Sequence, residues 1–417
     1  MKILVWHGYL LAGTGSNVYV RQLVREWSRE GHDVTVFSQE PHPERLDIGG
    51  AQAVRPDVHG LLPVFVLDRY DGYRVERVQD LSRGELDTWV EDNAAAIREH
   101  LPADLVYASH VLLGGPVGAA TGSRYAVAVH GSELEYSMRG NAELSAWGAQ
   151  ALEGAAAVIV GTGHIRTALE EVCGHVDRVH EVPPGVDVEL WRPQPRDEAL
   201  AALLEEARRD PPNPGNANER LPDEGNAERL EAFLAGDRAT VVYFGKLIRN
   251  KGVHLLLDAL RNVDARAVVV GFGDYRTELE QQAEGLPVLF TGAFEHRHLV
   301  HLLALADAAV VPSIFPEAFG MVAAEAAAAG CPPVVANHSG LAEIARGLDE
   351  DYPPRLRHLA SFPNGDVAEL TARLNEVVSL SDDDRAALRS AAREAASSRW
   401  SWASVSARLI AACGGRT

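Results

Sequence analysis

Residues 2–38 read KILVWHGYLLAGTGSNVYVRQLVREWSREGHDVTVFS, the pattern of a strand, a loop, a helix and a second strand. Lys2 to Trp6 is an unbroken apolar run, which is typical of a buried parallel strand. Apolar residues at helical spacing follow over 18–30, and Gly31 stands where a residue just past a helix is expected. Residues 33–38 then predict the second strand. Because a helical crossover joins parallel strands, the stretch predicts a βαβ unit.

The same alternation continues along the chain in two series. Further strands are predicted over 105–109, 125–129, 157–160 and 179–182, and again over 240–244, 267–270, 288–290, 308–311 and 333–336. Helical patterns follow over 253–260, 320–329, 367–378 and 382–396. We therefore expect an α/β protein of two Rossmann-like domains, at 1–195 and 238–398, with parallel sheets facing across a cleft. The segment between them is 196–237, and its residues 197–237 hold eleven acidic and four basic residues and a Pro/Asn-rich tract, which predicts a mobile insertion.

Composition narrows the class of protein. The formal net charge of −20 argues against a general nucleic-acid binder, because phosphate binding needs an excess of Lys and Arg. The three cysteines are scattered, which suggests neither a disulfide framework nor a cysteine metal site and fits a reducing compartment. No run approaches the ~20 apolar residues of a membrane span, and the apolar start is too short for a signal peptide. We expect a cytoplasmic protein without a transmembrane segment.

Two glycine loops follow predicted strands. In the first, Gly13, Gly15 and Ser16 join a strand to a helix, where free N–H groups and the helix dipole favour an anion. A simple tight turn is the alternative. The second loop holds Gly271 and Gly273, but position 276 is Arg, so the loop lacks the third glycine of a dinucleotide site.

Charged residues gather beside two other predicted strands. Lys246 and Lys251 flank the loop that begins at Gly245, and both ammonium groups could converge on a diphosphate; the alternative is a solvated basic turn. Glu317 lies in a Pro-bounded loop and Glu325 in the helix after it, so their carboxylates could bracket a polyol. Helix-dipole complementarity and solvation are the alternative reading of a single such glutamate.

The amides of Phe319, Gly320 and Met321 lie at the start of that helix, where a phosphate could bind. His130 ends a predicted strand, and ligands of open parallel sheets bind outside the carboxyl ends of strands. A structural histidine is the alternative there.

Taken together, these segments resemble a known family. The run from Glu317 to Glu325 has the E-x7-E spacing of retaining GT-B glycosyltransferases and resembles family 4, also called group 1. Further segments match that family in the same order, namely 13–18, His130-Gly131, 183–187, 245–252 and 271–273. The likeness covers nearly the whole chain.

The resemblance implies roles for the second domain, which would bind a nucleotide sugar. Lys246 and Lys251 would neutralise the donor diphosphate, although many relatives have Arg where Lys246 stands. Glu317 would contact the donor sugar hydroxyls and Glu325 the ribose hydroxyls. The backbone amides of Gly320 to Val322 would bind the phosphates, and Gly245, Gly271 and Gly273 belong to the same donor site.

The resemblance also implies roles for the first domain, on the acceptor side. His130 would lie on the reacting face of the sugar, and Gly13 to Ser16 would help to hold phosphate or acceptor. The run from Ser16 and Asn17 to Val20 resembles the same segment of family members that glycosylate inositol phosphate. A last helix, at about 400–413, would pack back on this domain.

We therefore expect a retaining glycosyltransferase that moves a hexosyl group from a UDP- or GDP-sugar to an acceptor hydroxyl. The expected partners are this nucleotide sugar and an unidentified acceptor, with no metal, no other cofactor and no nucleic acid. Two alternatives stay open: a GT-B sugar-nucleotide epimerase or hydrolase, and an inactive nucleotide-sugar binding protein.

Overall fold

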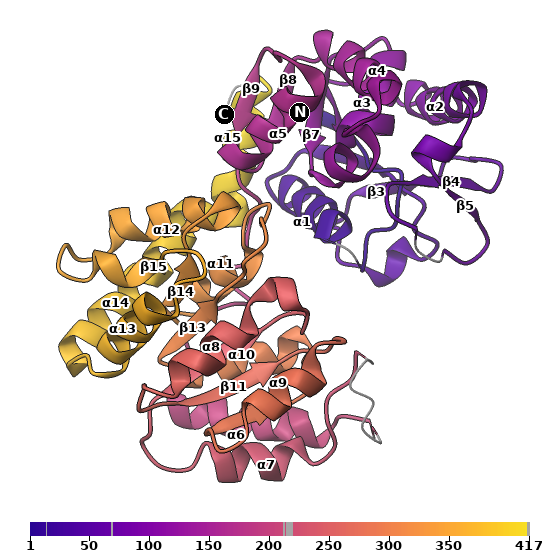
Figure 1. Cartoon of the computed structure of the whole chain (residues 1–417). Coiled ribbons are helices and arrows are strands. Elements are labelled where there is room, and N and C mark those ends of the chain that lie inside the picture. The colour runs from indigo at the N-terminus through magenta and orange to yellow at the C-terminus, as the bar shows by residue number, and fades with distance from the viewer. Residues whose placement is uncertain (14, 68–69, 212, 214–219, 415–417) are drawn as a thin grey trace. The chain divides into compact units, whose positions relative to one another are not determined.

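The computed structural model describes residues 1–13, 15–67, 70–211, 213 and 220–414. It divides the chain into two compact units (Figure 1). The first unit is Met1–Gly185 together with Trp402–Thr417, and the second is Val186–Ser401. The first domain thus ends ten residues before the boundary expected at 195, and the second begins before the acidic segment rather than after it.

The first unit is built on a seven-stranded parallel sheet in the order β3-β2-β1-β6-β7-β8-β9. A separate parallel pair, β4 and β5, lies outside this sheet. The strands are β1 (Lys2–Trp6), β2 (Asp33–Phe37), β3 (Gln52–Val54), β4 (Leu61–Val64), β5 (Arg74–Arg77), β6 (Leu105–Ser109), β7 (Tyr125–Val129), β8 (Ala157–Val160) and β9 (Val179–Glu181). The helices are α1 (Gly15–Arg29), α2 (Arg83–Arg98), α3 (Gly115–Ala120), α4 (Ala142–Glu153), α5 (Gly163–Cys173) and α15 (Trp402–Ala412).

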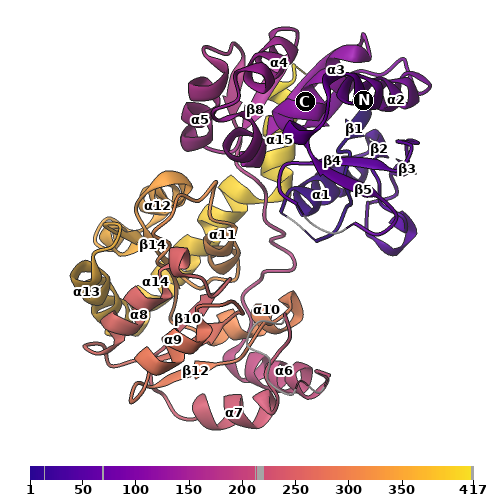
Figure 2. The same ribbon diagram turned by 45° about the vertical axis from the view of Figure 1, so that its right-hand side comes forward.

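The last helix of the chain belongs to the first unit. In Figures 1 and 2 the yellow helix α15 lies among the purple elements of that unit. Its Val405 and Leu409 are fully buried in the same apolar cluster as Val20 and Leu23 of α1. Trp402 packs against Gly185, where an added Cβ would lie 2.4 Å from the indole. The 3.6-residue spacing of apolar side chains therefore places one face of α15 against α1.

The second unit has a six-stranded parallel sheet in the order β12-β11-β10-β13-β14-β15. Its strands are β10 (Thr240–Phe244), β11 (Arg266–Val270), β12 (Val288–Phe290), β13 (Ala308–Val311), β14 (Pro333–Ala336) and β15 (Ser361–Phe362). Its helices are α6 (Arg196–Arg208), α7 (Asn226–Phe233), α8 (Val253–Leu260), α9 (Arg276–Gln282), α10 (His296–Leu305), α11 (Met321–Ala328), α12 (Ser339–Asp351), α13 (Val367–Val378) and α14 (Asp382–Ala395). The predicted organisation in two Rossmann-like halves is confirmed.

The acidic segment 196–237 differs from the mobile insertion that its composition predicted. It contains α6 and α7, which contact each other, and α6 packs on α10 (Figure 2). Ala199 and Leu203 of α6 and Leu230 of α7 are fully buried in the core of the second unit. The buried residues of α6, at positions 199, 203, 204 and 207, lie on one face of that helix, and this face packs into the core of the second unit. In the Pro/Asn-rich tract, residues 212 and 214–219 lie outside the described residues.

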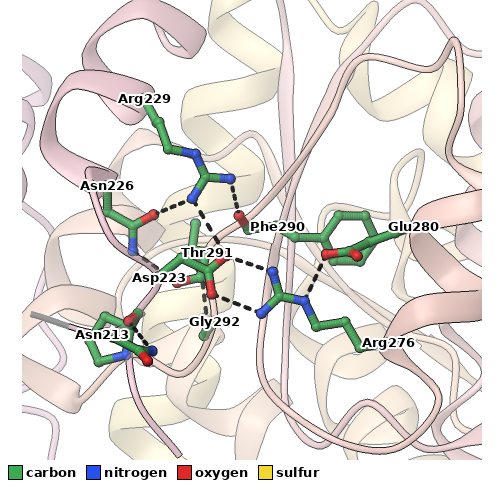
Figure 3. A network of polar contacts seen from close by, with 10 residues as sticks. Asn213, Asp223, Asn226, Arg229, Arg276, Glu280, Phe290, Thr291 and Gly292 are labelled. Carbon is green, nitrogen blue, oxygen red and sulfur yellow. Dashed lines mark hydrogen bonds and ion pairs between the residues drawn. The ribbon is translucent and has the colours of Figure 1, made fainter. Parts of the chain in front are cut away.

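A polar network joins this segment to the edge of the second sheet (Figure 3). The backbone N–H of Asp223 donates to the carbonyl of Thr291 at 2.8 Å, beside edge strand β12. The Asp223 carboxylate accepts two hydrogen bonds from the guanidinium of Arg276, at 2.8 and 2.6 Å. Buried Asn213 donates its side-chain N–H to the carbonyl of Pro222 at 2.7 Å. Residues 222–226 therefore cover an edge that would otherwise expose unpaired backbone groups.

Among the described residues, no helix combines the length and the apolar character that crossing a bilayer requires.

Candidate active site

In each sheet the strand order changes direction at one place, and candidate site residues lie in the loops next to it. In the second unit the reversal falls between β10 and β13, which are neighbours, with β11 and β14 beyond them. In open parallel sheets, ligands bind outside the carboxyl ends of the strands at such a reversal. The loops that follow β10 and β13 are residues 245–252 and 312–320. The structure brings these two loops together.

Backbone contacts fix the two loops against each other. The N–H groups of Ile314 and Phe315 both donate to the carbonyl of Asn250, at 2.9 and 3.3 Å. Gly252 has φ +69°, and a Cβ there would lie 1.9 Å from the carbonyl oxygen of Pro312. Only glycine allows both this conformation and this approach. The loops are therefore held in register by their main chains.

Lys251 and Glu317 meet where these loops adjoin. The Nζ of Lys251 donates to Oε1 of Glu317, and the two side chains are 32% and 22% exposed. The Ser313 hydroxyl donates to the same Oε1 at 2.6 Å. Both contacts fall on one carboxylate oxygen, and no described residue is hydrogen-bonded to Oε2. The pair can therefore offer a ligand a cation and an acceptor oxygen side by side.

The backbone of Glu317 is held at both ends by the start of α12. Its N–H donates to the hydroxyl of Ser339 at 2.9 Å, and its carbonyl accepts the N–H of Gly340, also at 2.9 Å. A Cβ on Gly340 would lie 2.5 Å from the backbone of Ala318, so this contact also requires glycine. The carboxylate is thus presented by a braced loop.

Helix α11 begins directly after this loop. Gly320, at φ +114°, is its N-cap residue, and the first-turn amides of Met321 and Val322 point out of the helix. Phe319 is buried and packs its ring edge on Trp400, 6.1 Å between centroids. This aromatic contact fixes the direction in which α11 starts. The predicted phosphate-binding amides are therefore at a helix N-terminus, beside Glu317.

Glu325 lies one turn further along α11. It is half-buried, and no described residue is hydrogen-bonded to its carboxyl group. Burial raises the pKa of Glu325 to about 8. The carboxyl group therefore holds its proton at neutral pH in the protein alone, and a ligand hydroxyl would supply the partner that it lacks.

Close main-chain contacts require the two glycines of the second glycine loop. A Cβ on Gly271 would lie 1.9 Å from the carbonyl oxygen of Gly245, and one on Gly273 would lie 2.3 Å from that of Leu247. The N–H of Leu247 donates to the carbonyl of Phe272 at 2.7 Å. The loops after β10 and β11 are therefore packed main chain against main chain. Lys246, in the first of them, has an exposed side chain.

In the first unit the sheet reverses between β1 and β6, and three histidines follow strands there. His7 comes directly after β1, His110 after β6 and His130 after β7, the next strand of the sheet. The ring centroids of His7 and His110 are 5.9 Å apart, and those of His110 and His130 are 4.6 Å apart. His7 and His110 are buried, and His130 is half-buried. We call these residues the histidine cluster.

A buried carboxylate, Glu133, organises this cluster. Its Oε2 accepts from His110 Nδ1 at 3.1 Å, and its Oε1 accepts the backbone N–H of His130, also at 3.1 Å. Burial by itself would raise the pKa of Glu133, but His110 and these hydrogen bonds outweigh it and hold the pKa at about 2. Burial, with a smaller effect of His110, lowers the pKa of His130 to about 3. His130 is therefore neutral at physiological pH.

The first glycine loop lies next to this cluster. Gly13 has φ +98°, Gly15 begins α1, and Thr14 between them lies outside the described residues. Asn17 was predicted to bind acceptor, but its side chain is buried. Its Oδ1 bonds His7 Nε2 at 2.8 Å and its Nδ2 donates to the carbonyl of Ala12 at 2.6 Å. The amide thus bonds inside the domain, whereas Ser16, one residue earlier, is only half-buried.

Sequence reasoning selected His130 but did not select His7, His110 or Glu133. Both missed histidines directly follow a strand, so the rule that selected His130 would have found them. Ser313, which bonds Glu317, had no comparable signal, because its partner is four residues away in an irregular loop.

Solved structures of the same architecture define the class. The chain matches the crystal structure of Anabaena HepE in complex with UDP over 99% of its length and 100% of that chain, with a TM-score of 0.69 at 20% identity. It matches sucrose-phosphate synthase from Thermosynechococcus elongatus over 98% and 97% of the two chains, with a TM-score of 0.62 at 19% identity. The fold is the GT-B fold of glycosyltransferases.

Family models and curated relatives narrow the class further. The model of glycosyltransferase family 4 matches residues 13–190, and that of glycosyl transferases group 1 matches residues 226–395. The chain belongs to family 4 of the GT-B glycosyltransferases.

Three curated relatives illustrate this membership. A GDP-mannose-dependent α-(1-6)-phosphatidylinositol dimannoside mannosyltransferase of Mycobacterium tuberculosis is 44% identical over 110 residues, which span 25% of this chain and only 29% of the relative. A monomannoside mannosyltransferase of the same species is 29% identical over 72% of this chain and 71% of the relative. A D-inositol 3-phosphate glycosyltransferase of Xylanimonas cellulosilytica is 27% identical over 95% and 90%.

Proposed function

We propose that this protein transfers a hexosyl group from a nucleoside-diphosphate sugar to an acceptor hydroxyl, with retention of the anomeric configuration. The observation that carries the proposal is the meeting of Lys251 and Glu317 beside the N-terminus of α11, at the strand-order reversal of the second sheet. A cation, a hydroxyl-binding carboxylate and a set of free amides are what a sugar diphosphate needs. The proposal includes no metal or organic cofactor.

Each of these residues would have a role that follows from its charge and its hydrogen-bonding groups. Breaking the glycosidic bond leaves charge on the diphosphate, and Lys251, Lys246 and the first-turn amides of α11 would stabilise it by preorganised electrostatics. Oε2 of Glu317 would accept hydrogen bonds from the hydroxyl groups of the sugar, and Glu325 would form hydrogen bonds with the hydroxyl groups of the ribose. Retention without a protein nucleophile follows if the acceptor attacks from the side of the leaving diphosphate. One leaving oxygen then takes the proton of the acceptor hydroxyl.

The donor and acceptor classes rest on the relatives. The names of two of them state that they depend on GDP-mannose, and the structure of the Anabaena neighbour contains UDP. We propose a GDP- or UDP-hexose donor, and a polyol acceptor such as an inositol phosphate or phosphatidylinositol mannoside, which the names of three relatives contain.

The alternative functions do not require an acceptor. An epimerase or hydrolase consumes a nucleotide sugar alone, and an inactive binding protein consumes none. We favour transfer because the family and the relatives named above are glycosyltransferases.

The test is release of nucleoside diphosphate from GDP-mannose and UDP-glucose, with and without D-inositol 3-phosphate or a phosphatidylinositol mannoside. Acceptor-dependent release supports transfer, and the anomeric configuration of the product, read by NMR, decides retention. Equal release without acceptor supports a hydrolase or a hydrolysing epimerase instead, and conversion to a second nucleotide sugar without release supports an isomerising epimerase. Lys251→Ala serves as the negative control, because it removes the charge and leaves the main-chain bonds of the loop in place.

A further inference from the structure

A third loop meets the loop that holds Glu317. It follows β14, the neighbour of β13 in the second sheet, and leads into α12 through Asn337 and His338. The side chains of His338 and Ser339, the first residue of α12, are half-buried, and both bond residues of the loop after β13. Neither residue has a role in the transfer chemistry proposed above.

Ser339 has a backbone conformation that serine rarely adopts. Its φ is +48°, and it is the only non-glycine residue with positive φ among the described residues of the second unit. This conformation is strained for a residue with a Cβ, and it persists only where the surrounding contacts hold it. Glycine would adopt it without strain. The presence of a hydroxyl at this position therefore needs an explanation beyond the shape of the turn.

The hydroxyl of Ser339 belongs to a closed set of four hydrogen bonds. It accepts the backbone N–H of Glu317 at 2.9 Å, and it bonds Nδ1 of His338 at 3.2 Å. Nε2 of His338 donates to the carbonyl of Ser313 at 2.6 Å, and the hydroxyl of Ser313 donates to Oε1 of Glu317, also at 2.6 Å. We call Ser313, Glu317, His338 and Ser339 the serine–histidine network.

The serine–histidine network can form in either charge state of the imidazole. A carbonyl only accepts, so Nε2 of His338 carries a proton whether the ring is neutral or charged. A hydroxyl has one proton and two lone pairs, so Ser339 can donate to Nδ1 of a neutral ring or accept from Nδ1 of a charged ring. In both cases a lone pair of Ser339 remains for the N–H of Glu317.

The network supports the Glu317 carboxylate independently of Lys251. Lys251 and Ser313 both donate to Oε1 of Glu317 in the protein alone. The negative charge of a bound diphosphate would attract the ammonium group of Lys251. The neutral hydroxyl of Ser313, a residue that is only 1% exposed, would stay with the carboxylate. Ser313 would then fix which oxygen of Glu317 faces the sugar.

We propose that His338 and Ser339 are positioning residues for the donor sugar. Ser339 holds the backbone of Glu317, and His338 holds the backbone of Ser313. Together they direct Oε2 of Glu317 toward one hydroxyl group of the hexose and so determine which hydroxyl the enzyme requires. The inference rests on the proposed function and deepens it, because it names residues that set the selectivity for the donor sugar.

The first measurement compares donor selectivity. Binding constants and kcat/KM are measured for GDP-mannose, UDP-glucose and the singly deoxygenated analogues of each sugar. The wild type should penalise one deoxy position that Glu317→Gln penalises less. Ser339→Ala should reduce the same penalty about three- to tenfold, as expected for one neutral hydrogen bond, and should bind GDP and UDP as the wild type does. An unchanged penalty, or an equal loss of affinity for the nucleoside diphosphates, overturns the proposal.

Pairs of variants at each position separate the hydrogen bonds from the backbone strain. Ser339→Gly removes the hydroxyl and also the strain, so it should lose the same selectivity as Ser339→Ala without unfolding at a lower urea concentration than that variant. His338→Gln can still donate to the carbonyl of Ser313 and should keep more of the penalty than His338→Phe, which cannot. Wild-type selectivity in Ser339→Gly or in His338→Phe contradicts the positioning role.

Ser381→Ala is the matched control. The hydroxyl of Ser381 also accepts a backbone N–H, that of Asp384, but at the start of α14 and outside the loops of the site. This variant should keep wild-type selectivity, and a loss equal to that of Ser339→Ala would overturn the proposal by tracing the effect to stability alone.

The same data separate this proposal from the proposed function. If the wild type binds nucleotide sugars with this selectivity but transfers none, the proposed function fails and the positioning role stands. If the wild type transfers sugar and Ser339→Ala keeps the full deoxy penalty, the positioning role fails and the proposed function stands. If no nucleotide sugar binds, both are wrong.

Discussion

Replacing Lys251 by Ala should cost little stability and much activity. In the protein alone, Lys251 is 32% exposed and is paired with Glu317, which is 22% exposed. Solvent screens such a pair, so its loss should lower the free energy of unfolding by only about 0.2–1 kcal/mol. The loop itself is held by main-chain bonds, such as those from Ile314 and Phe315 to Asn250, which the substitution leaves in place.

The cost to catalysis should be larger because charge grows on the leaving diphosphate during the reaction. Removing one preorganised charge of that kind typically lowers the rate about 10²–10³-fold, or roughly 3–4 kcal/mol. The loss should fall on kcat more than on KM, since the interaction is stronger in the transition state than in the bound substrate. The prediction is therefore an activation penalty several times the stability penalty.

Glu317→Gln should fail in a different way. The amide can still accept the hydroxyl of Ser313 but loses the ion pair with Lys251. Because Glu317 orients the sugar through its hydroxyls, the variant should discriminate less between the true donor and a deoxy donor. The double variant should lose less activity than the two single losses multiplied together, since the residues touch.

The assay is kcat and KM for the donor and its deoxy analogue in the wild type, both single variants and the double variant, with urea unfolding of each. Arg261→Ala is the charge-matched control, because Arg261 caps the opposite end of α8 from Lys251. The assignment is refuted if Lys251→Ala keeps kcat within about threefold while Glu317→Gln keeps full discrimination. A loss equal to that of Arg261→Ala would show an effect of net charge only.

Three further predictions concern stability. Burial lowers the pKa of His130 to about 3, against 6.5 in the unfolded chain. The first unit should therefore be fully stable above pH ~6.5 and lose free energy of unfolding as the pH falls toward 3. In urea unfolding, His130→Phe should reduce this dependence on pH, and an unchanged dependence would show that His130 is not its origin. Arg276→Ala leaves the Asp223 carboxylate without its two charged hydrogen bonds and should cost about 2–3 kcal/mol, and a loss below ~0.5 kcal/mol in urea unfolding would show that the network of Figure 3 is not stabilising. Ending the chain at Ser401 removes the apolar face of α15, beginning at Trp402, so limited proteolysis should cut the first unit faster, and unchanged resistance would contradict its packing.

The sheets were predictable from sequence because their strands are buried on both faces. Strands such as β1, β6, β7 and β10 are almost entirely apolar, with Lys2, Ser109 and Thr240 only at strand ends, and each was predicted at its observed bounds. β3 is short and partly exposed, and it was not predicted. The acidic segment was misjudged because average composition hides the few apolar positions that α6 buries.

The sequence could predict which side chains lie in a loop after a strand, but not which of these side chains contact each other. Lys251 and Glu317 could be selected because each lies in the loop after a strand, but their ion pair depends on β10 lying next to β13, which are far apart in the chain. The role of Glu133 depends in the same way on β6 lying next to β7. Strand order, rather than local pattern, is the information that sequence reasoning lacked.

The two strand-order reversals carry opposite chemistry, and this difference suggests how the work is divided. The second unit offers Lys251 and helix N–H groups, which are donors suited to an anion. The first unit offers the Nδ1 of His7, unpartnered among the described residues, in a ring that is neutral because burial lowers its pKa, and the nearby carboxylate of Glu133, whose pKa is held at about 2 and whose negative charge opposes phosphate. Phosphate groups should therefore bind to the second unit rather than to the first. If inorganic phosphate protected the first unit from hydrogen exchange more than the second, this division would be wrong.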